Sequence, residues 1–272
     1  MLTVSWQIEK WNPVLNFTLK AINSRSSLKG DGELTVEEGD VRSDMLTRWA
    51  SVKNEAPLKM STIEMIVNLS TVIFAGSDTT ATGLRAIIYY LCKDLSIMKK
   101  VVDELDAAER QGVLSNPVAY KEALNHLQYL NAVIKEALRI HPGVGLPLER
   151  HVPAGGATIC GQHIPANTIV GINAWVLHYD EKVFPQPERF IPERWLDNDE
   201  KKLADMEKSF FAFGAGSRTC MGKNISLMEM TKLIPQLLRE YEVRLADPSK
   251  EWKTTNFWFV QQSGVECILT KR

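Results

Sequence analysis

The segment FFAFGAGSRTCMGKNIS (residues 210–226) decides the fold, because it places a cysteine in a glycine-rich turn directly before a predicted helix. Glycines such as Gly216 and Gly222 allow positive φ angles and let the backbone approach a flat partner closely. Cys220 precedes the helix, whose positive dipole end and unpaired N–H groups favour a thiolate. Arg218 adds a cation that can pair with a carboxylate on the partner.

Other glycine-rich motifs do not fit this segment. A phosphate-binding P-loop needs four residues between its glycine and Gly-Lys, whereas five separate Gly216 from Gly222-Lys223 here, and Asn224 stands where Ser or Thr is required. A buried structural cysteine remains the alternative for Cys220 taken alone. The pattern F-x-x-G-x-R-x-C-x-G outweighs that alternative; its matched positions are Phe213, Gly216, Arg218, Cys220 and Gly222.

Composition indicates an ordinary globular protein. The chain has 272 residues, is 44% hydrophobic and 24% charged, and carries a formal net charge of -1. We therefore expect no nucleic-acid partner. The four cysteines form no CxxC pair, which excludes typical structural zinc spacing and favours a reducing compartment. The five histidines form no HxxxH motif and are expected to cap, pack or lie in loops.

Neither a signal peptide nor a membrane span is expected. The first twenty residues are interrupted by polar side chains and by Pro13, so they contain no continuous apolar region. The most apolar stretch, residues 63–76, contains Glu64, Asn68 and Ser70. It falls short of the roughly eighteen uninterrupted apolar residues that a span needs.

Hydrophobic periodicity predicts a mainly α-helical fold with a minor β portion. Ser61 and Glu64 form a capping box before a helix of about thirty residues, in which the AGSDTTATG run should cause local irregularity. Residues 24–40 are expected to be an exposed loop. The other expected elements are helices at 96–111, 127–140 and 226–241, β-hairpins within 143–176, and a hairpin at 258–269 around residues 262–264.

The cysteine segment resembles the haem-ligand signature of the cytochrome P-450 family. The resemblance implies that Cys220 is the axial thiolate ligand of haem b (iron protoporphyrin IX), which favours O–O cleavage. It also implies that Arg218 contacts a haem propionate and that Phe213 packs near the sulfur. Gly216 and Gly222 belong to the same cofactor-binding loop.

A second motif of the family lies upstream, in the predicted long helix. Residues 75–80, AGSDTT, match its A/G-G-x-D/E-T-T/S pattern. By this resemblance Gly76 lies against the haem, and Asp78 and Thr79 are the acid–alcohol pair of catalysis. A hydroxyl beside a carboxylate can hold water and relay the protons that splitting dioxygen requires. An ordinary helix with solvent-facing Ser and Thr is the alternative.

The E-x-x-R motif places Glu136 and Arg139 one turn apart on a helix, which alone is a weak signal. It is followed by PERFIPERW (residues 187–195), in which Pro192 to Trp195 match the family's PERF-like element with Trp in place of Phe. In the family Glu136, Arg139 and Arg194 would form a buried triad that locks the cysteine loop.

The resemblance also implies roles for residues that lie outside these motifs, from their place along the chain. Arg150 aligns with a second propionate-binding arginine, and a strand-edge arginine is the alternative. The segments expected to line the substrate pocket comprise Val144, Gly145, Leu146, Phe257 and Trp258.

The resemblance implies that residues 1–272 are the C-terminal, haem-binding part of a single cytochrome P-450 domain. The residues within and around these motifs resemble those of the fungal secondary-metabolism branch of the family, such as the pisatin demethylases. Such a monooxygenase hydroxylates or O-demethylates a small apolar molecule, using dioxygen and electrons from NADPH–cytochrome P-450 reductase.

The family's location is the cytosolic face of the endoplasmic reticulum membrane. We expect the anchor and the first part of the fold to be missing from this chain, which would make it cytoplasmic. The alternatives are a truncated, inactive remnant and redox signalling through an exposed Cys220 without haem.

Overall fold

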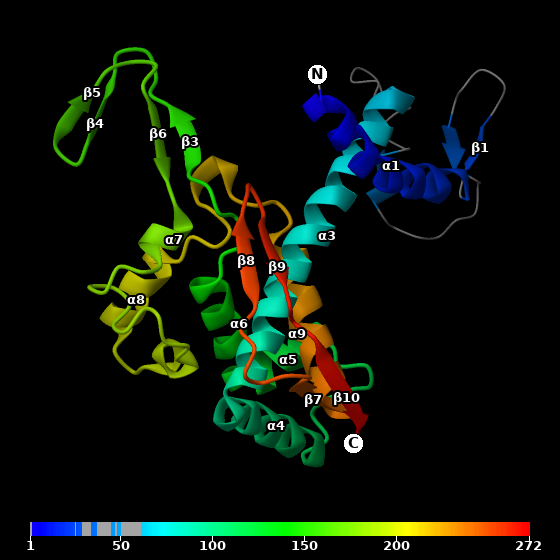
Figure 1. Ribbon diagram of the computed structural model, residues 1–272, viewed down its shortest axis with the longest axis vertical. Helices are drawn as coiled ribbons and strands as arrows, with labels where there is room; N and C mark the ends of the chain where they lie inside the picture. The colour runs from blue at the N-terminus through cyan, green and yellow to red at the C-terminus, as the bar shows by residue number, and fades with distance from the viewer. Residues whose placement is uncertain (1, 25, 29–33, 37–44, 47, 50–60) are drawn as a thin grey trace. The chain divides into compact units, whose positions relative to one another are not determined.

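A computed structural model describes residues 2–24, 26–28, 34–36, 45–46, 48–49 and 61–272 (Figure 1). The chain divides into two compact units, residues 1–78 and 79–272. The long helix α3 (Thr62–Lys93) runs through the division.

The first unit contains helix α1 (Leu2–Asn23) and a short antiparallel pair, β1 (Ser26–Leu28) with β2 (Leu34–Val36). Its described core is the buried pair Ile22 and Met65. The stretch 24–40 was expected to be a loop, and its described residues instead include this hairpin; the remainder of the stretch lies outside the described residues.

Helix α3 confirms the predicted long helix and its capping box. The Ser61 N–H donates to Glu64 Oε2 at 2.8 Å, and the Glu64 N–H donates to Ser61 Oγ at 3.2 Å. The expected irregularity is wrong, because the helix is continuous from 62 to 93. Hydroxyls along it bond back to helix carbonyls, as Thr71 does to Val67 at 2.8 Å, so they do not compete with the helical backbone.

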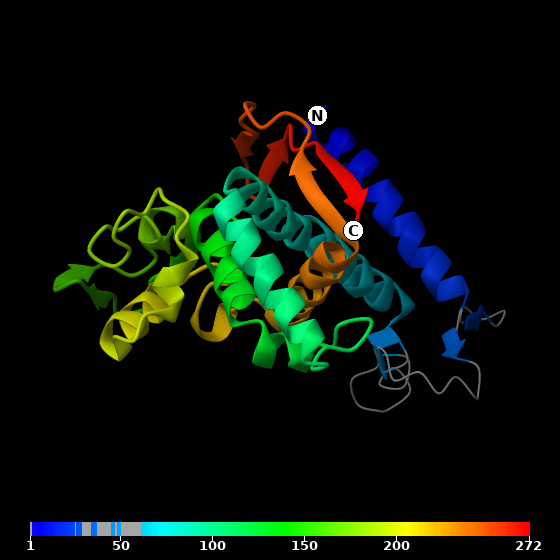
Figure 2. The ribbon, with the colours of Figure 1, turned by 90° about the horizontal axis from the view of Figure 1, so that it is seen from below.

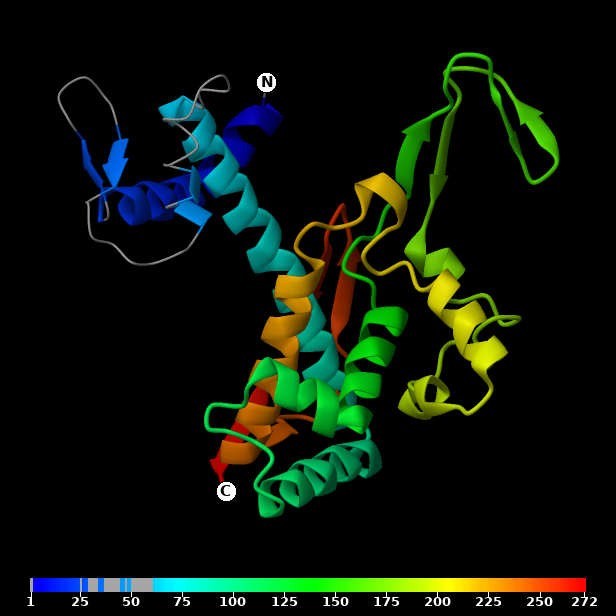
Figure 3. The ribbon, with the colours of Figure 1, turned by 180° about the vertical axis from the view of Figure 1, so that it is seen from behind.

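In the second unit, four helices and the C-terminal half of α3 enclose one hydrophobic core (Figure 2). The helices are α4 (Leu95–Arg110), α5 (Tyr120–His126), α6 (Gln128–Ile140) and α9 (Lys223–Glu240). Helix α4 lies across the end of the bundle that α5, α6 and α9 form (Figure 3). Buried members of the core include Ile87, Leu91, Val101, Leu105, Leu130, Val133, Ile134, Met230, Ile234 and Leu238.

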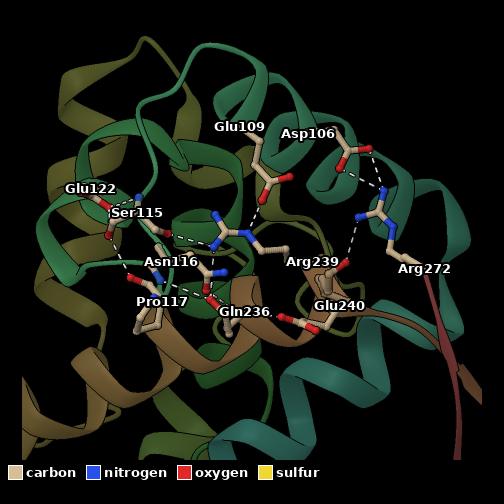
Figure 4. Close-up of polar contacts among 12 residues, drawn as sticks. Asp106, Glu109, Ser115, Asn116, Pro117, Glu122, Gln236, Arg239, Glu240 and Arg272 are labelled. Atoms are coloured by element: carbon tan, nitrogen blue, oxygen red, sulfur yellow. Dashed lines mark hydrogen bonds and ion pairs between the residues drawn. The ribbon is translucent and has the colours of Figure 1, made fainter.

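Polar contacts fasten α4 to the C-terminal end of α9 (Figure 4). Arg239 pairs with Glu109 and donates to the Ser115 carbonyl at 2.9 Å. Arg272, at the end of the chain, pairs with Asp106 at 2.8 Å. These contacts lie at the end of the core opposite to the cysteine loop, which precedes the first residue of α9.

The β portion consists of two-stranded antiparallel sheets. Strand β3 (Leu148–His151) pairs with β6 (Ile169–Ile172), and the hairpin of β4 (Ala157–Ile159) and β5 (Gln162–Ile164) extends beyond them. These strands confirm the hairpins predicted between residues 143 and 176.

The hairpin predicted at 258–269 is wrong. Strand β9 (Val260–Ser263) pairs with the preceding β8 (Lys253–Asn256), and β10 (Cys267–Lys271) pairs with β7 (Tyr241–Leu245). Gly264, with φ of 86°, ends β9 and redirects the chain to β7. The local turn signal was therefore real, but the strands on its two sides belong to different sheets.

Short elements complete the unit: helix α7 (Ala174–Leu177), the 3-10 turns η1 (Pro192–Leu196) and η2 (Gly216–Arg218), and helix α8 (Glu200–Ser209). The fold is mainly α with a minor β portion, as predicted. Among the described residues, no helix combines the length and apolarity needed to cross a membrane.

Candidate functional site

The cysteine loop connects α8 to α9 through tight turns. Gly214 and Gly216 have φ of 68° and 69°, the left-handed region that glycine tolerates best. The Cys220 N–H donates to the Phe213 carbonyl at 2.9 Å, which closes the loop on itself. The Lys223 N–H donates to the Cys220 carbonyl at 3.3 Å where α9 begins. Cys220 thus precedes α9 directly, as predicted.

The Cys220 side chain is available as a ligand. It is exposed and not part of a disulfide. A Cβ built on Gly216 meets nothing within 4 Å, and one on Gly222 would lie 3.8 Å from the Cys220 sulfur. The sulfur is therefore exposed, and Gly222 leaves the space beside it free of a side chain.

The other predicted haem-contacting residues lie in the cysteine loop and on the strand beside it. Arg218 is exposed in η2, and Phe213 is half-buried against the core. Strand β3 contacts the loop, since a Cβ built on Gly214 would lie 3.3 Å from Leu148 Cδ1. Arg150 is exposed two residues further along β3, and its Nη1 donates to the Glu149 carbonyl at 2.6 Å. The structure thus places the strand of Arg150 beside the cysteine loop.

Glu136, Arg139 and Arg194 form one buried cluster. Arg139 holds Glu136 with two bonds, Nε to Oε2 and Nη2 to Oε1, both at 2.9 Å. Arg194 Nε donates to the same Oε1 at 3.0 Å. Glu136 and Arg139 are 0% exposed and Arg194 is 6% exposed. Burial lowers the pKa of Arg194, and the carboxylate of Glu136 opposes that effect.

Two further donors to Glu136 were not predicted. Trp195 Nε1 donates to Oε2 at 2.9 Å, and the Ile191 N–H donates to Oε1 at 3.0 Å. The carboxylate is therefore surrounded by donors, which is what a buried charge requires. The sequence shows Trp195 where the family has Phe, and an indole N–H is a donor that Phe lacks. The hydrogen bond from Trp195 could therefore have been predicted from this difference.

His178 was also missed as a site residue. It is 0% exposed, and its ring lies between α6 and the cysteine loop: Nδ1 is 2.8 Å from the Arg139 carbonyl, and Nε2 accepts from the Phe211 N–H at 2.7 Å. Burial lowers its pKa to about 4. No motif marks this histidine, because both of its partners are backbone groups.

The AGSDTT motif lies within α3 at the division between the units, with Asp78 ending the first unit and Thr79 beginning the second. Asp78 is exposed and Thr79 is half-buried. A Cβ built on Gly76 meets nothing within 4 Å, so this side of the helix is open. Thr80, which received no role, is buried and bonds Ser226 of α9 at 2.9 Å, joining the motif's last residue to the helix after Cys220.

The two segments predicted to line a substrate pocket are neighbours. Val144 forms a β-bridge with Phe259, and the Gly145 N–H donates to the Trp258 carbonyl at 3.1 Å. Leu146, Phe257 and Trp258 are 44%, 56% and 50% exposed, so the bridge presents apolar side chains on its surface. Segments more than a hundred residues apart are thus neighbours, and we call the exposed side chains of Leu146, Phe257 and Trp258 on them the apolar wall.

Comparison with known proteins bears on the family of this chain. The family model described as cytochrome P-450 matches residues 11–266. The chain is 42% identical over 232 residues to cytochrome P-450 monooxygenase ACRTS1 of Alternaria alternata, covering 85% of this chain and 61% of that protein. It is 40% identical over 264 residues to cytochrome P-450 monooxygenase cicH of Emericella nidulans, covering 97% and 52%.

A third relative is pisatin demethylase of Fusarium vanettenii, which is 44% identical over 201 residues, covering 74% of this chain and 38% of that protein. The chain therefore spans roughly half the length of the relatives that it matches.

Proposed function

Because the chain belongs to the cytochrome P-450 family, we propose that residues 1–272 are the C-terminal, haem-binding part of a single monooxygenase domain, with Cys220 as the axial ligand of haem b. One observation carries the proposal: the Cys220 thiol is exposed and unpaired at the start of α9, in a loop closed by its own backbone bond to Phe213.

The residues present fit a haem. The open face around Gly216 gives a planar group room beside the sulfur, and the exposed guanidinium of Arg218 can pair with a propionate. Arg150 is a second candidate for a propionate, because its strand contacts the loop at Gly214. When haem is bound through Cys220, the thiolate would donate electron density to the iron, which favours cleavage of an O–O bond.

Proton delivery falls to Asp78 and Thr79 in this proposal. The Thr79 hydroxyl would hold a water by a hydrogen bond, and that water would give up the proton that the reaction uses. Asp78, which is exposed to solvent, would take a proton from solvent and return it to that water. Gly76 lies about one helical turn before Thr79, and it has no side chain there. A flat group can therefore approach the backbone of α3 closely at this position.

The reaction proposed is monooxygenation of a small apolar molecule, hydroxylation or O-demethylation. One atom of dioxygen enters the substrate, and the other leaves as water with two protons and two electrons from NADPH–cytochrome P-450 reductase. The apolar wall of Leu146, Phe257 and Trp258 would contact the substrate, because these apolar side chains are exposed on neighbouring segments. The reductase partner implies the cytosolic face of the endoplasmic reticulum membrane.

A second candidate is haem binding without turnover. The exposure of the same apolar wall favours it, because water would reach a substrate held there by one side only. Reductase-dependent turnover distinguishes the two candidates, and both predict that Cys220 ligates haem.

The test uses the whole chain, expressed with haem supplementation. We expect haem uptake and, in the reduced protein under carbon monoxide, the strongly red-shifted Soret band of a thiolate ligand. Cys220→Ser should abolish that band, whereas Cys160→Ser should keep it, since Cys160 is also exposed and unpaired but lies in the β4–β5 turn. A thiolate band in the Cys220→Ser protein would refute the ligand assignment.

A further inference from the structure

His178 joins two backbone segments that are distant in sequence. Its Nδ1 contacts the carbonyl of Arg139 in α6, 39 residues away, and its Nε2 contacts the N–H of Phe211, 33 residues away. A carbonyl only accepts and an amide N–H only donates, so the ring is neutral and carries its proton on Nδ1. Its low pKa, caused by burial, agrees with this state.

The ring is fixed in orientation as well as in protonation. It stacks on Phe210 with centroids 5.5 Å apart and an interplanar angle of 8°, and it meets Phe184 edge-on at 6.1 Å. The Arg139 Nη1 donates to the backbone carbonyl of His178 at 2.9 Å. The Glu136–Arg139 pair therefore positions the main chain from which the imidazole projects.

From Phe211 the hydrogen bonds continue to the cysteine. The Phe211 carbonyl accepts the Gly214 N–H at 3.0 Å, which makes the first turn of the loop, and the Phe213 carbonyl inside that turn accepts the Cys220 N–H at 2.9 Å. A displacement of Phe211 would thus move the acceptor that holds the Cys220 backbone.

Within the described part of the chain, the bond from the Phe211 N–H to His178 Nε2 is the only hydrogen bond between residues 211–222 and a side chain. The other hydrogen bonds of these residues join backbone groups. Apolar packing of Ala212 and Phe213 against the core also holds the loop. Packing is non-directional, however, and does not fix a backbone amide to one acceptor.

We propose that His178 is the positioning residue for the Cys220 ligand: its neutral imidazole transmits the geometry of the Glu136–Arg139–Arg194 cluster to the cysteine loop. The inference rests on the proposed function only in taking Cys220 as the haem ligand. It adds a specific residue that connects the buried triad to the loop, which no motif identifies.

Three substitutions separate the two hydrogen bonds. In His178→Gln the side-chain amide reaches the position of Nε2 and can still accept from Phe211. In His178→Asn the shorter amide reaches the position of Nδ1 and can donate only to the Arg139 carbonyl. His178→Phe keeps the ring and its stacking on Phe210 and makes neither bond.

Two measurements on the whole chain test the proposal. Amide hydrogen exchange at Phe211 and Cys220 is measured without haem, with the amide of Leu105 in α4 as an internal control for global unfolding. The ferrous–carbon monoxide spectrum of the haem-loaded chain then reports what fraction retains the thiolate-type Soret band.

We expect exchange at Phe211 to be about tenfold faster in the Asn and Phe variants, as loss of one net hydrogen bond implies, with Leu105 unchanged. The same variants should lose most of the thiolate-type band, and Gln should restore both properties. Wild-type exchange and spectra in the Asn and Phe variants would overturn the proposal, as would a Gln variant that is no better than Asn.

The two proposals fail in different ways. If the wild-type chain binds no haem through Cys220, the proposed function fails, and the exchange measurement alone decides whether His178 positions the loop. If wild type shows the thiolate band and the Asn variant shows it equally, the role of His178 fails while Cys220 remains the ligand. Should the Phe variant not fold, the comparison of Gln with Asn gives the answer.

Discussion

Arg139 and His178 each donate a hydrogen bond from the side chain to the backbone carbonyl of the other: Arg139 Nη1 to His178 at 2.9 Å, and His178 Nδ1 to Arg139 at 2.8 Å. This reciprocal pair joins helix α6 to the segment after α7, although the two residues are 39 positions apart. Because both side chains are 0% exposed, neither bond competes with water. The pair is the starting point for predictions about the stability of the site.

Glu136→Gln should destabilise the chain by about 3–5 kcal/mol, because it leaves two buried guanidinium groups without their carboxylate. The matched control is Asp103→Asn, which removes the exposed pair with Lys99 and should cost less than about 1 kcal/mol. Urea unfolding followed by far-UV circular dichroism measures both. Similar costs for the two substitutions would contradict the assignment of Glu136 as the centre of the cluster.

Trp195→Phe should cost about 1.5–3 kcal/mol, the usual range for a hydrogen bond to a charged group, because the Glu136 carboxylate loses the indole N–H. Trp175→Phe is the control, since Trp175 Nε1 is buried and has no hydrogen-bond partner among the described residues. It should cost less in the same unfolding assay. A larger cost at Trp175 would mean that ring packing, and not the hydrogen bond, decides the effect at Trp195.

The sequence predicted what local patterns control. Periodicity and caps located the helices, as with the Ser61–Glu64 box before α3, and spacing identified Glu136 with Arg139 as neighbours on one face of α6. Helix α9 begins three residues before its predicted start at Ser226, with Gly222 as its N-cap. Gly222 was expected to have a positive φ, which is wrong: its φ is -80°, an ordinary helical value that suits the start of α9.

Long-range pairing could not be predicted in the same way. Strands β7 and β10 are both short, and their register, in which Val243 lies opposite Leu269, depends on tertiary packing. The short helix α5 was missed for a local reason: only seven residues are helical, and Ala119 at its N-cap has no side chain that could cap it. His178 escaped notice because its partners are backbone groups on segments distant in sequence.

Acid should destabilise the folded chain through two buried histidines. Burial lowers the pKa of both His141 and His178 to about 4, from an ordinary value near 6.5. The folded pKa is below the unfolded one, so the unfolded state binds more protons between these values. The contribution to stability is complete above pH 6.5 and is lost as the pH falls towards 4.

At about 1.4 kcal/mol for each pKa unit, the whole shift corresponds to roughly 3.5 kcal/mol for each imidazole, of which about 2.5 kcal/mol is lost between pH 7 and pH 4.5. Urea midpoints at pH 7 and pH 4.5 measure it. His178→Gln lacks one of the titrating groups and should lose less stability over this interval than wild type, whereas His163→Gln, at an exposed position of β5, should behave as wild type. An equal loss in all three proteins would exclude His178 as a source of the effect.

Thr79→Ala should uncouple electron use from product formation in the haem-loaded protein with reductase, because the proposed proton relay loses its hydroxyl. We expect peroxide release for each NADPH consumed to rise several-fold. Thr71→Ala is the control: Thr71 lies in the same helix, is exposed, and donates to the Val67 carbonyl. If the Thr79→Ala protein releases no more peroxide for each NADPH than wild type, Thr79 takes no part in proton delivery and is only a residue of the helix.

Gly145→Ala should separate the two segments of the apolar wall. A Cβ at this position would lie 1.4 Å from Asn256 Oδ1 and 2.4 Å from its Cγ, so the Asn256 side chain has to move and lose its bond to the Gly145 carbonyl, now 3.0 Å long. Overpacking of this kind costs about 1–3 kcal/mol. Gly76→Ala is the control, since nothing lies within 4 Å of its Cβ and alanine favours a helix.

A double-mutant cycle identifies the cause of the Gly145 effect. Asn256→Ala alone removes one hydrogen bond and should cost about 1 kcal/mol. In the double variant the added methyl no longer meets the amide, so the total cost should fall below the sum of the single costs by about 0.5–3 kcal/mol. Urea unfolding provides the four free energies. Amide exchange at Trp258 locates the change, because its carbonyl accepts the Gly145 N–H and its exposed ring belongs to the wall. Additive costs would show that Gly145 is required for its backbone conformation and not for the space beside Asn256.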